Sequence, residues 1–361
     1  ATIDGFIITN SGSAGVFLEG VNTRVTNNVI TFNTVGVELY GSNATISNNA
    51  IGFANYGIVA SNMGASEMTF PVITNNRLYY NSPAMYLLAE SSYPLAPTIS
   101  NNSVFYNGKA IVGYAGDTGD LLVPTISNNE ISYSLYGAGG INLYVYNEGQ
   151  IHADVISNDI SQHDNGGIQG IVYSGEGYPN YTNFPSLSLV AHGNDIHENM
   201  SDLISGGGIT LMTYGYGGYE GYPGYSRIDA SISNNIIRGN EGMGILALAS
   251  VEGDGYESYF APAVSKINSV ISNNIVSLNN GPGMVTAGGF FYGPAGSTSV
   301  NSELFNNLIV ANGTDYGMGV VVFSAEEYGV NSASLHSVND VIIGNNGYGI
   351  AAYVEGYGDG L

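Results

Sequence analysis

The sequence of 361 residues contains no cysteine, no tryptophan and only six lysine and arginine residues, against 29 acidic ones. Without cysteine the chain can form neither a disulfide framework nor a thiolate metal site, so its core alone must stabilise the fold. The net charge of −23 repels nucleic-acid phosphates and anionic lipid surfaces, which argues against both as partners. No apolar run is long enough to span a bilayer, so we expect no membrane insertion.

An asparagine or aspartate recurs along the whole chain and is followed two residues later by an apolar residue. The recurring residues are Asp4, Asn28, Asn49, Asn76, Asn102, Asn129, Asn158, Asn194, Asn235, Asn274, Asn307 and Asp340. A second column lies five residues after most of them, at Asn33, Asn81, Asn107, Asn199, Asn240, Asn279, Asn312 and Asn345. Asparagine tolerates the positive φ of tight corners, and stacked amides hydrogen-bond from coil to coil. The pattern predicts an all-β fold, a single right-handed parallel β-helix (solenoid) of about twelve coils in one domain, 1–361.

Several units share the motif Ile-Ser-Asn-Asn, for example residues 46–49, 99–102 and 126–129. The motif resembles the repeats of right-handed parallel β-helix proteins of the pectate-lyase-like superfamily. This resemblance implies the fold over essentially the whole chain. It implies no one function, because the superfamily includes polysaccharide lyases, glycosidases, tailspikes, adhesins and surface-layer proteins.

Coil lengths vary mainly between a small-apolar pair, such as Gly57-Ile58, and the next recurring asparagine, so we expect long insertions at one corner. The insertions are rich in tyrosine, glycine and acidic residues, and tyrosine offers a large rigid contact area with a polar tip. The candidate contact residues are Tyr178, Tyr181, Tyr214, Tyr216, Tyr219, Tyr222, Tyr225, Tyr256, Tyr259, Tyr292 and Tyr328. Flexible low-complexity loops are the alternative interpretation.

The position after the recurring asparagine is expected to face outward, and in three successive coils it holds Glu130, Asp159 and Asp195. Carboxylates stacked about 4.8 Å apart must be compensated by a cation, a proton or solvent. In pectate lyases, acidic residues of neighbouring coils hold Ca²⁺ and a basic residue takes up the substrate proton. The resemblance therefore implies a calcium site here, near His197 and Arg238, or a catalytic one, whereas the residues themselves favour ordinary solvated carboxylates. No motif requires a cofactor, and calcium is the one candidate.

Four of the five histidines, His152, His163, His192 and His197, fall in neighbouring coils. Imidazole suits zinc or copper, but their spacing matches no familiar metal motif, and His163 occupies a place in the second asparagine column. The sequence also lacks a Gly-x-Ser-x-Gly turn and a phosphate-binding loop. A role without catalysis is therefore favoured, while an enzymatic role stays open.

In later coils the outward position that held carboxylates becomes apolar, at Ile236, Ile275, Leu308 and Val341. A contiguous apolar row is rarely left facing water. Either a long insertion folds over it, which we favour, or another protein chain covers it.

Five Asn-x-Ser/Thr sequons, at Asn43, Asn101, Asn180, Asn199 and Asn312, are glycosylation candidates, and with the acidity they favour an extracellular or cell-surface location. Neither end shows a capping segment, so the terminal coils are expected either to stack head to tail or to have lost a cap. The first hypothesis is an extracellular structural protein, a self-associating subunit of a filament, sheath or surface layer. The alternative is a carbohydrate-active or carbohydrate-binding β-helix whose partners are cell-surface glycans.

Overall fold

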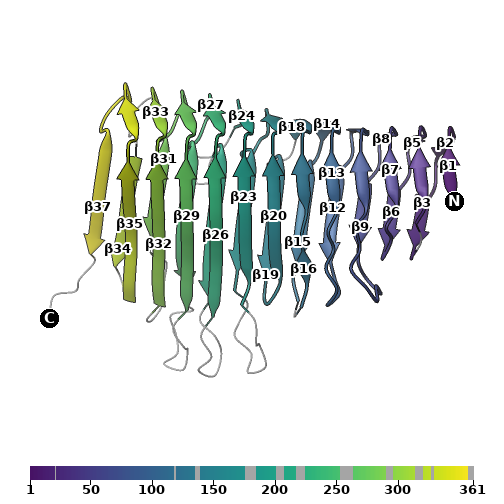
Figure 1. Ribbon diagram of the computed structural model, residues 1–361, viewed down its shortest axis with the longest axis horizontal. Coiled ribbons are helices and arrows are strands. Elements are labelled where there is room, and N and C mark those ends of the chain that lie inside the picture. The colour runs from purple at the N-terminus through teal and green to yellow at the C-terminus, as the bar shows by residue number, and fades with distance from the viewer. Residues whose placement is uncertain are drawn as a thin grey trace.

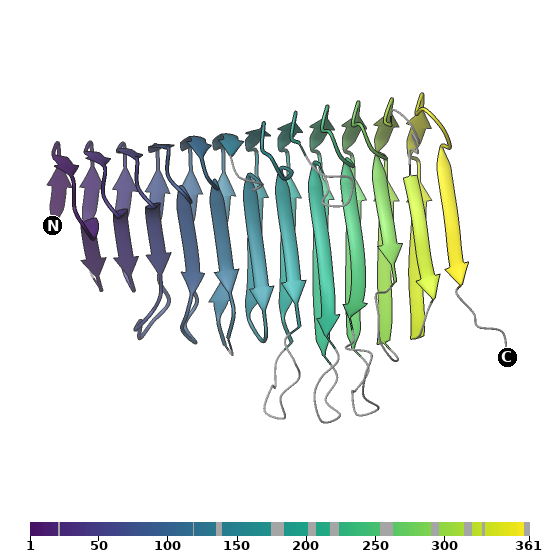
Figure 2. The ribbon, with the colours of Figure 1, turned by 180° about the vertical axis from the view of Figure 1, so that it is seen from behind.

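The described strands run parallel to their neighbours one coil away and form three sheets along a rod (Figures 1 and 2). The computed structural model describes residues 1–20, 22–117, 119–134, 139–174, 184–200, 207–216, 224–252, 263–289, 296–313, 320–326 and 329–356. These residues contain no helix, and so none that is long and apolar enough to cross a membrane. Sheets B and C hold 12 strands each, which confirms the predicted all-β solenoid of about twelve coils.

Each coil contributes one strand to each sheet in the order A, B, C. Sheet A consists of β1 (Thr2–Asp4), β4 (Arg24–Thr26), β7 (Thr45–Ser47), β10 (Val72–Thr74), β13 (Thr98–Ser100), β17 (Thr125–Ser127), β20 (Gln150–Ile156), β23 (Ser186–His192), β26 (Tyr225–Ser233), β29 (Val264–Ser272), β32 (Gly296–Phe305) and β35 (Gly329–Val338), with β16 (Leu121–Leu122) beside β20. Sheet B consists of β2 (Ile7–Thr9), β5 (Val29–Thr31), β8 (Ala50–Gly52), β11 (Arg77–Tyr79), β14 (Ser103–Asn107), β18 (Glu130–Ser134), β21 (Asp159–Ser161), β24 (Asp195–His197), β27 (Ile236–Arg238), β30 (Ile275–Ser277), β33 (Leu308–Val310) and β36 (Val341–Ile343). Sheet C consists of β3 (Ala14–Glu19), β6 (Val35–Tyr40), β9 (Tyr56–Ser61), β12 (Met85–Ala89), β15 (Ile111–Ala115), β19 (Ile141–Tyr146), β22 (Ile168–Tyr173), β25 (Ile209–Tyr216), β28 (Ile245–Glu252), β31 (Met284–Gly288), β34 (Val320–Glu326) and β37 (Ile350–Gly356).

The strands of sheet A lengthen along the rod, from 3 residues in β1 to 7 in β20 and 10 in β32. The lengthening can be followed in Figure 1. Most of the long connections lead from sheet C to the next strand of sheet A, as between β22 and β23 and between β28 and β29, although the connection from β24 to β25, between sheets B and C, is as long as the second of these. Parts of the connections from sheet C to sheet A, residues 175–183, 217–223, 253–262 and 290–295, lie outside the described part of the chain. The prediction that insertions lie mainly at one corner is therefore confirmed.

The first asparagine column holds the coils in register at the corner between sheets A and B. At Asn129, Oδ1 accepts a hydrogen bond from the backbone N–H of Asn102 at 2.9 Å. Its Nδ2 donates to the carbonyl oxygen of Ile99 at 3.0 Å and to Oδ1 of Asn158 at 2.9 Å. The same contacts join consecutive coils from Asn28 to Asp340, and the asparagines of this column are at most 2% exposed. The predicted stacking is confirmed.

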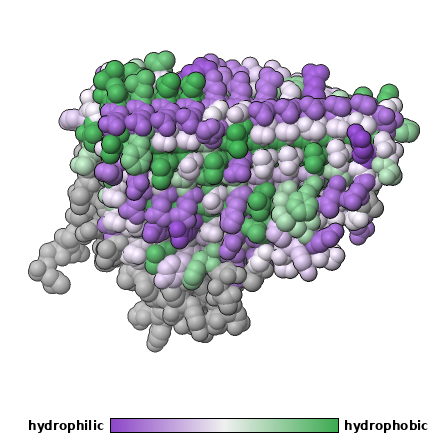
Figure 3. Space-filling view, viewed as in Figure 1, coloured by the Kyte–Doolittle hydropathy of each residue, from purple (hydrophilic) through white to green (hydrophobic). Residues whose placement is uncertain are grey.

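The exposed residue before each column asparagine has a positive φ, for example 55° at Asn128 and 57° at Asn234. Asparagine tolerates this left-handed conformation better than most residues, which explains the repeated Asn-Asn pairs. In Figure 3 a hydrophilic row follows the rod from end to end near the height at which sheet A meets sheet B.

The first coil departs from the sequence alignment. Asp4 pairs with Thr26, not with Asn28, so the alignment of Asp4 with the asparagine column is wrong by two residues. Phe6 occupies the column position, and its N–H donates to Oδ1 of Asn28 at 2.9 Å. The error arose because an apolar residue also lies two positions after Asp4, whereas the inward residue of this coil is Ile8, which pairs with Ile30.

The inward residues of the three sheets pack into one continuous apolar core, with Ile30, Ile131 and Ile237 fully buried. Small residues precede the sheet C strands because the next coil lies very close there. A Cβ atom on Gly57 would lie 2.4 Å from the carbonyl oxygen of Ala84, closer than atoms can approach. The recurring small-apolar pairs therefore mark the start of the inward-facing strands of sheet C, as predicted.

Candidate functional site

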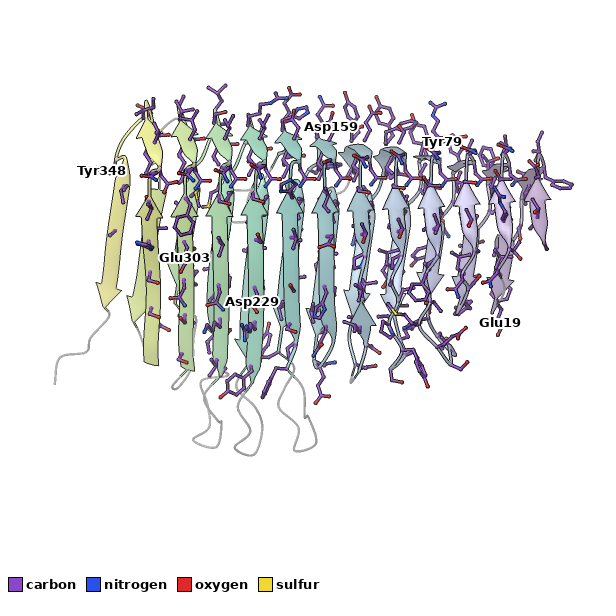
Figure 4. The ribbon with its side chains drawn as sticks, in the orientation of Figure 1. Glu19, Tyr79, Asp159, Asp229, Glu303 and Tyr348 are labelled. Atoms are coloured by element: carbon purple, nitrogen blue, oxygen red, sulfur yellow. The ribbon has the colours of Figure 1, made fainter. Side chains whose placement is uncertain are left out.

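The three predicted carboxylates lie in register on the outer face of sheet B. Glu130 on β18 pairs with Asp159 on β21, which pairs with Asp195 on β24. Each follows a buried column asparagine, and strand alternation turns it away from the core. Figure 4 shows Asp159 at the upper edge of the rod. The predicted outward direction is confirmed.

Two of these carboxylates are already bound to basic side chains of later coils. His197 Nε2 lies 3.0 Å from Oδ1 of Asp159, and Arg238 Nη2 lies 2.9 Å from Oδ2 of Asp195. Among the described residues, no group of three or more histidine, aspartate or glutamate side chains is arranged to hold a metal ion. The carboxylates are therefore aligned as predicted, but they do not converge into a ligand set for calcium.

We expect calcium to leave the thermal unfolding of wild-type protein and of Asp159→Ala equally unchanged. The reason is that Asp159 Oδ1 already contacts His197 and Asp195 Oδ2 already contacts Arg238, so one oxygen of each carboxylate is occupied. Differential scanning fluorimetry with and without millimolar calcium measures this directly. A stabilisation of the wild type that Asp159→Ala abolishes would restore the calcium interpretation.

The remaining histidines have separate environments. His163 lies in the second asparagine column and is fully buried, which confirms its predicted place there. Its Nε2 is 3.0 Å from the carbonyl oxygen of Ile131, and its Nδ1 is 3.1 Å from the backbone N–H of Ser134. His192 contacts Ser233 Oγ at 3.0 Å on the outer side of sheet A. The four histidines thus do not form a common site.

Three of the predicted contact tyrosines, Tyr214, Tyr216 and Tyr225, are described. The other eight, Tyr178, Tyr181, Tyr219, Tyr222, Tyr256, Tyr259, Tyr292 and Tyr328, lie outside the described residues. Tyr214 belongs to a stacked column of rings on sheet C, and its ring centroid lies 4.9 Å from that of Tyr173. The column also contains Tyr114 and Tyr146, and burial raises the pKa of the Tyr146 and Tyr173 hydroxyls. Sequence reasoning missed this column, although a tyrosine follows Ile141, Ile168 and Ile209 by five residues.

A second aromatic column was also missed. It lies at the corner between sheets B and C, where three of its rings directly precede Asn33, Asn81 and Asn107 of the second asparagine column, and the other two precede Ala54 and Ser134. We call this surface the aromatic corner: Phe32, Phe53, Tyr80, Tyr106 and Tyr133. Successive ring centroids lie 4.8, 5.1, 5.7 and 4.8 Å apart with nearly parallel planes, and the side chains are 39–58% exposed. Their stacked faces cover one another, so the corner presents mainly ring edges.

The family model for the right-handed beta helix region matches residues 1–123. The same three-sheet coil continues through the described residues to β37. The protein is a right-handed parallel β-helix. No curated protein and no solved structure matches the chain.

The apolar row of the later coils lies in register along sheet B of the β-helix. Ile236, Ile275 and Val341 are 39, 40 and 47% exposed, and Leu308 lies between the last two. The favoured expectation, a long insertion folded over this row, is therefore wrong for these three side chains. A buried apolar cluster instead lies outside the main core on sheet C, with Met212, Leu246, Val285 and Ala287 at most 9% exposed.

The glycosylation candidates differ in access on the β-helix. Asn101 is exposed and Asn43 is half-buried, whereas Asn180 lies outside the described residues. Asn199 and Asn312 are fully buried in the second column, where their Nδ2 atoms donate to Asn240 and Asn345 at 2.9 and 3.1 Å. A glycan on either Nδ2 would disrupt the column, so these two are not accessible acceptors in the folded chain. Modification of Asn43 and Asn101 stays a prediction.

Proposed function

We propose that the protein is a structural β-helix of the cell exterior, whose copies associate side by side through the aromatic corner. The observation that supports this function most is the set of stacked, exposed rings at Phe32, Phe53, Tyr80, Tyr106 and Tyr133. Contiguous exposed apolar surface on a soluble protein marks an interaction site. A second apolar row, Ile236, Ile275 and Val341, is exposed further along sheet B, beyond the coils that carry Asp159 and Asp195.

Aromatic residues at this corner cost the folded state more free energy than their stacking returns. All five have φ between 54° and 57°, a conformation that costs a residue with a side chain about 1–2 kcal/mol. Stacking of one ring on the next returns only about 0.5–1.5 kcal/mol. Glycine or asparagine would suit these positions better, and Gly239 and Gly344 take the equivalent place in later coils. A function at the surface explains why the early coils carry rings.

A second copy of the chain is the partner that fits this surface best. Both copies repeat at the same coil spacing of about 4.8 Å, so ring edges of one ladder can fit between those of the other along its whole length. The net charge of −23 opposes such pairing at low ionic strength, and salt screens this repulsion. Association is therefore expected to strengthen as salt is raised.

The triple variant Phe53→Asn/Tyr80→Asn/Tyr106→Asn is expected to stay monomeric under conditions in which the wild type associates. Asparagine accepts the left-handed backbone at all three positions, so the fold should be retained while the apolar edges are removed. Sedimentation velocity at 50 mM and 500 mM salt, over a range of protein concentrations, measures the association. Circular dichroism of the variant checks its fold.

Phe70→Asn is the matched control, since Phe70 is equally exposed at 51% but lies outside the aromatic corner. It should associate like the wild type. A wild type that is monomeric at every concentration and salt, or a triple variant that still associates, would contradict the proposal.

A further inference from the structure

The outer face of sheet A carries a groove that crosses four neighbouring coils. It has a volume of about 380 Å³ and lies over β23, β26, β29 and β32. Asp229 and Glu303, on its walls, are labelled in Figure 4. None of the motifs in the sequence pointed to this surface, because its side chains belong to different coils and are separated by up to 115 positions.

One wall of the groove is a row of hydrogen-bonded polar side chains. Register places Asp229, Asn268 and Asn301 side by side on three consecutive coils. Asn268 Nδ2 donates to Oδ1 of Asp229 at 2.8 Å, and Asn301 Nδ2 donates to Oδ1 of Asn268 at 3.3 Å. The row is thus held in place before any ligand arrives, and each amide still has hydrogen-bonding capacity to spare.

The neighbouring row is partly apolar. Val190 and Val270 stand on either side of Ser231 in this row, and Val270 is 42% exposed. Arg227 Nε lies 2.6 Å from Oδ2 of Asp229, which neutralises that carboxylate on the side away from the valines. Glu303 follows Val270 in the same row and is the second carboxylate of the groove. The groove therefore has a fixed polar wall, an apolar strip and one carboxylate at its end in addition to the Asp229–Arg227 pair.

We infer that this groove binds a neutral oligosaccharide. A pyranose ring has hydroxyl groups along its edges and C–H groups on its faces, which match the amide row and the valine strip. The backbone groups of sheet A already pair with neighbouring coils, so a peptide would lack the main-chain hydrogen bonds that peptide recognition uses. The net charge of −23 disfavours acidic glycans. This site lies on sheet A and does not depend on association through the aromatic corner.

A glycan array followed by isothermal titration calorimetry with the best neutral oligosaccharide tests the inference on the full chain. Asn268→Ala/Asn301→Ala should weaken binding by about tenfold or more, because it removes hydrogen-bonding groups from the polar wall. Ser231→Trp should abolish binding, since Ser231 is exposed within the groove and an indole there would fill it without breaking the polar row. This second variant keeps the test valid if the double variant fails to fold.

His152→Ala is the matched control, because His152 lies in the same outward row two coils before Asp229 and outside the groove. It should bind within about twofold of the wild type. Wild-type protein that binds no glycan, or only acidic ones, would overturn the inference. Binding that Ser231→Trp leaves intact would overturn it equally, because the ligand would then occupy another surface.

Discussion

Replacing Asn129 by leucine is expected to lower the free energy of unfolding by at least about 3 kcal/mol. The substitution removes the acceptor of the Asn102 N–H and the donor to the Ile99 carbonyl, both in the buried first column. A buried polar group left without a partner costs about 1–3 kcal/mol, and the side-chain bonds to the neighbouring asparagines are lost as well. Urea denaturation followed by circular dichroism measures the change.

Asn128→Gly is the control for this prediction. Asn128 is exposed, with φ at 55°, and glycine adopts that conformation without strain, so its unfolding midpoint should stay close to that of the wild type. If Asn129→Leu proved as stable as Asn128→Gly, the asparagine column would not be what holds the coils in register. Hydrogen exchange in the variant should increase first in the coils next to Asn129, because a solenoid coil is stabilised mainly by its neighbours.

The second large effect is a loss of stability in mild acid that originates at His163. Burial lowers the pKa of His163 from 6.5 to about 4. The Ile131 carbonyl can only accept, so Nε2 carries the proton and Nδ1 accepts from the Ser134 N–H. Neutral imidazole thus reproduces the oxygen and amide contacts of an asparagine, and protonation would place a positive charge in a fully buried position.

Stability falls in acid because the unfolded chain binds the proton at a higher pH than the folded chain does. As pH falls below 6.5 the unfolded chain takes up the proton while the folded chain does not, so stability falls between pH 6.5 and pH 4. The His163 contribution to this loss is about 3 kcal/mol. His163→Asn should remove it, because asparagine fills the same position at Asn199 and Asn240. The unfolding midpoints of both proteins are measured at pH 7.5 and pH 4.5, and the acid-induced change of the variant is subtracted from that of the wild type. The contribution of the carboxylates, which both proteins share, cancels in this difference.

Equal acid sensitivity of the wild type and His163→Asn would contradict this account. A variant that is less stable than the wild type at pH 7.5 but more stable at pH 4.5 would still support it. Such a result would mean that the imidazole fills the site better than the amide while it is neutral.

The asparagine columns could be predicted from the sequence because each coil repeats the same local chemistry. A buried amide in this column must hydrogen-bond to the coils on both sides, so asparagine is needed at the same place in each coil. Asn129 and Asn235 can therefore be recognised by this recurrence. The same reasoning failed at Asp4, where a residue of similar chemistry stands two positions away from the true register. Local spacing alone could not separate the two, since the hydrogen bond that distinguishes them joins different coils.

The surfaces were harder to predict than the core. Asn268 and Asn301 meet only because coils of unequal length stack in register, and nothing near either residue indicates the other. The aromatic corner carried a usable signal, an aromatic residue directly before Asn33, Asn81 and Asn107. The structural role of the asparagines explains their spacing by itself, so the spacing gave no reason to expect stacked rings beside them. At the predicted calcium ligands, register alone was not enough. Glu130, Asp159 and Asp195 lie in one row along the rod, as the sequence predicts, but side chains in such a row do not converge on a single point.

The lengthening of sheet A gives the molecule a taper. Strands of 3 residues at β1 and 10 at β32 make one end of the rod narrower than the other, as the ribbon in Figure 1 shows. Two wedges laid side by side in opposite directions compensate each other and give a flat pair, whereas wedges laid in the same direction accumulate an angle at every step. An array of molecules that all point the same way would therefore curve as it grows, whereas an array of alternating directions would stay planar.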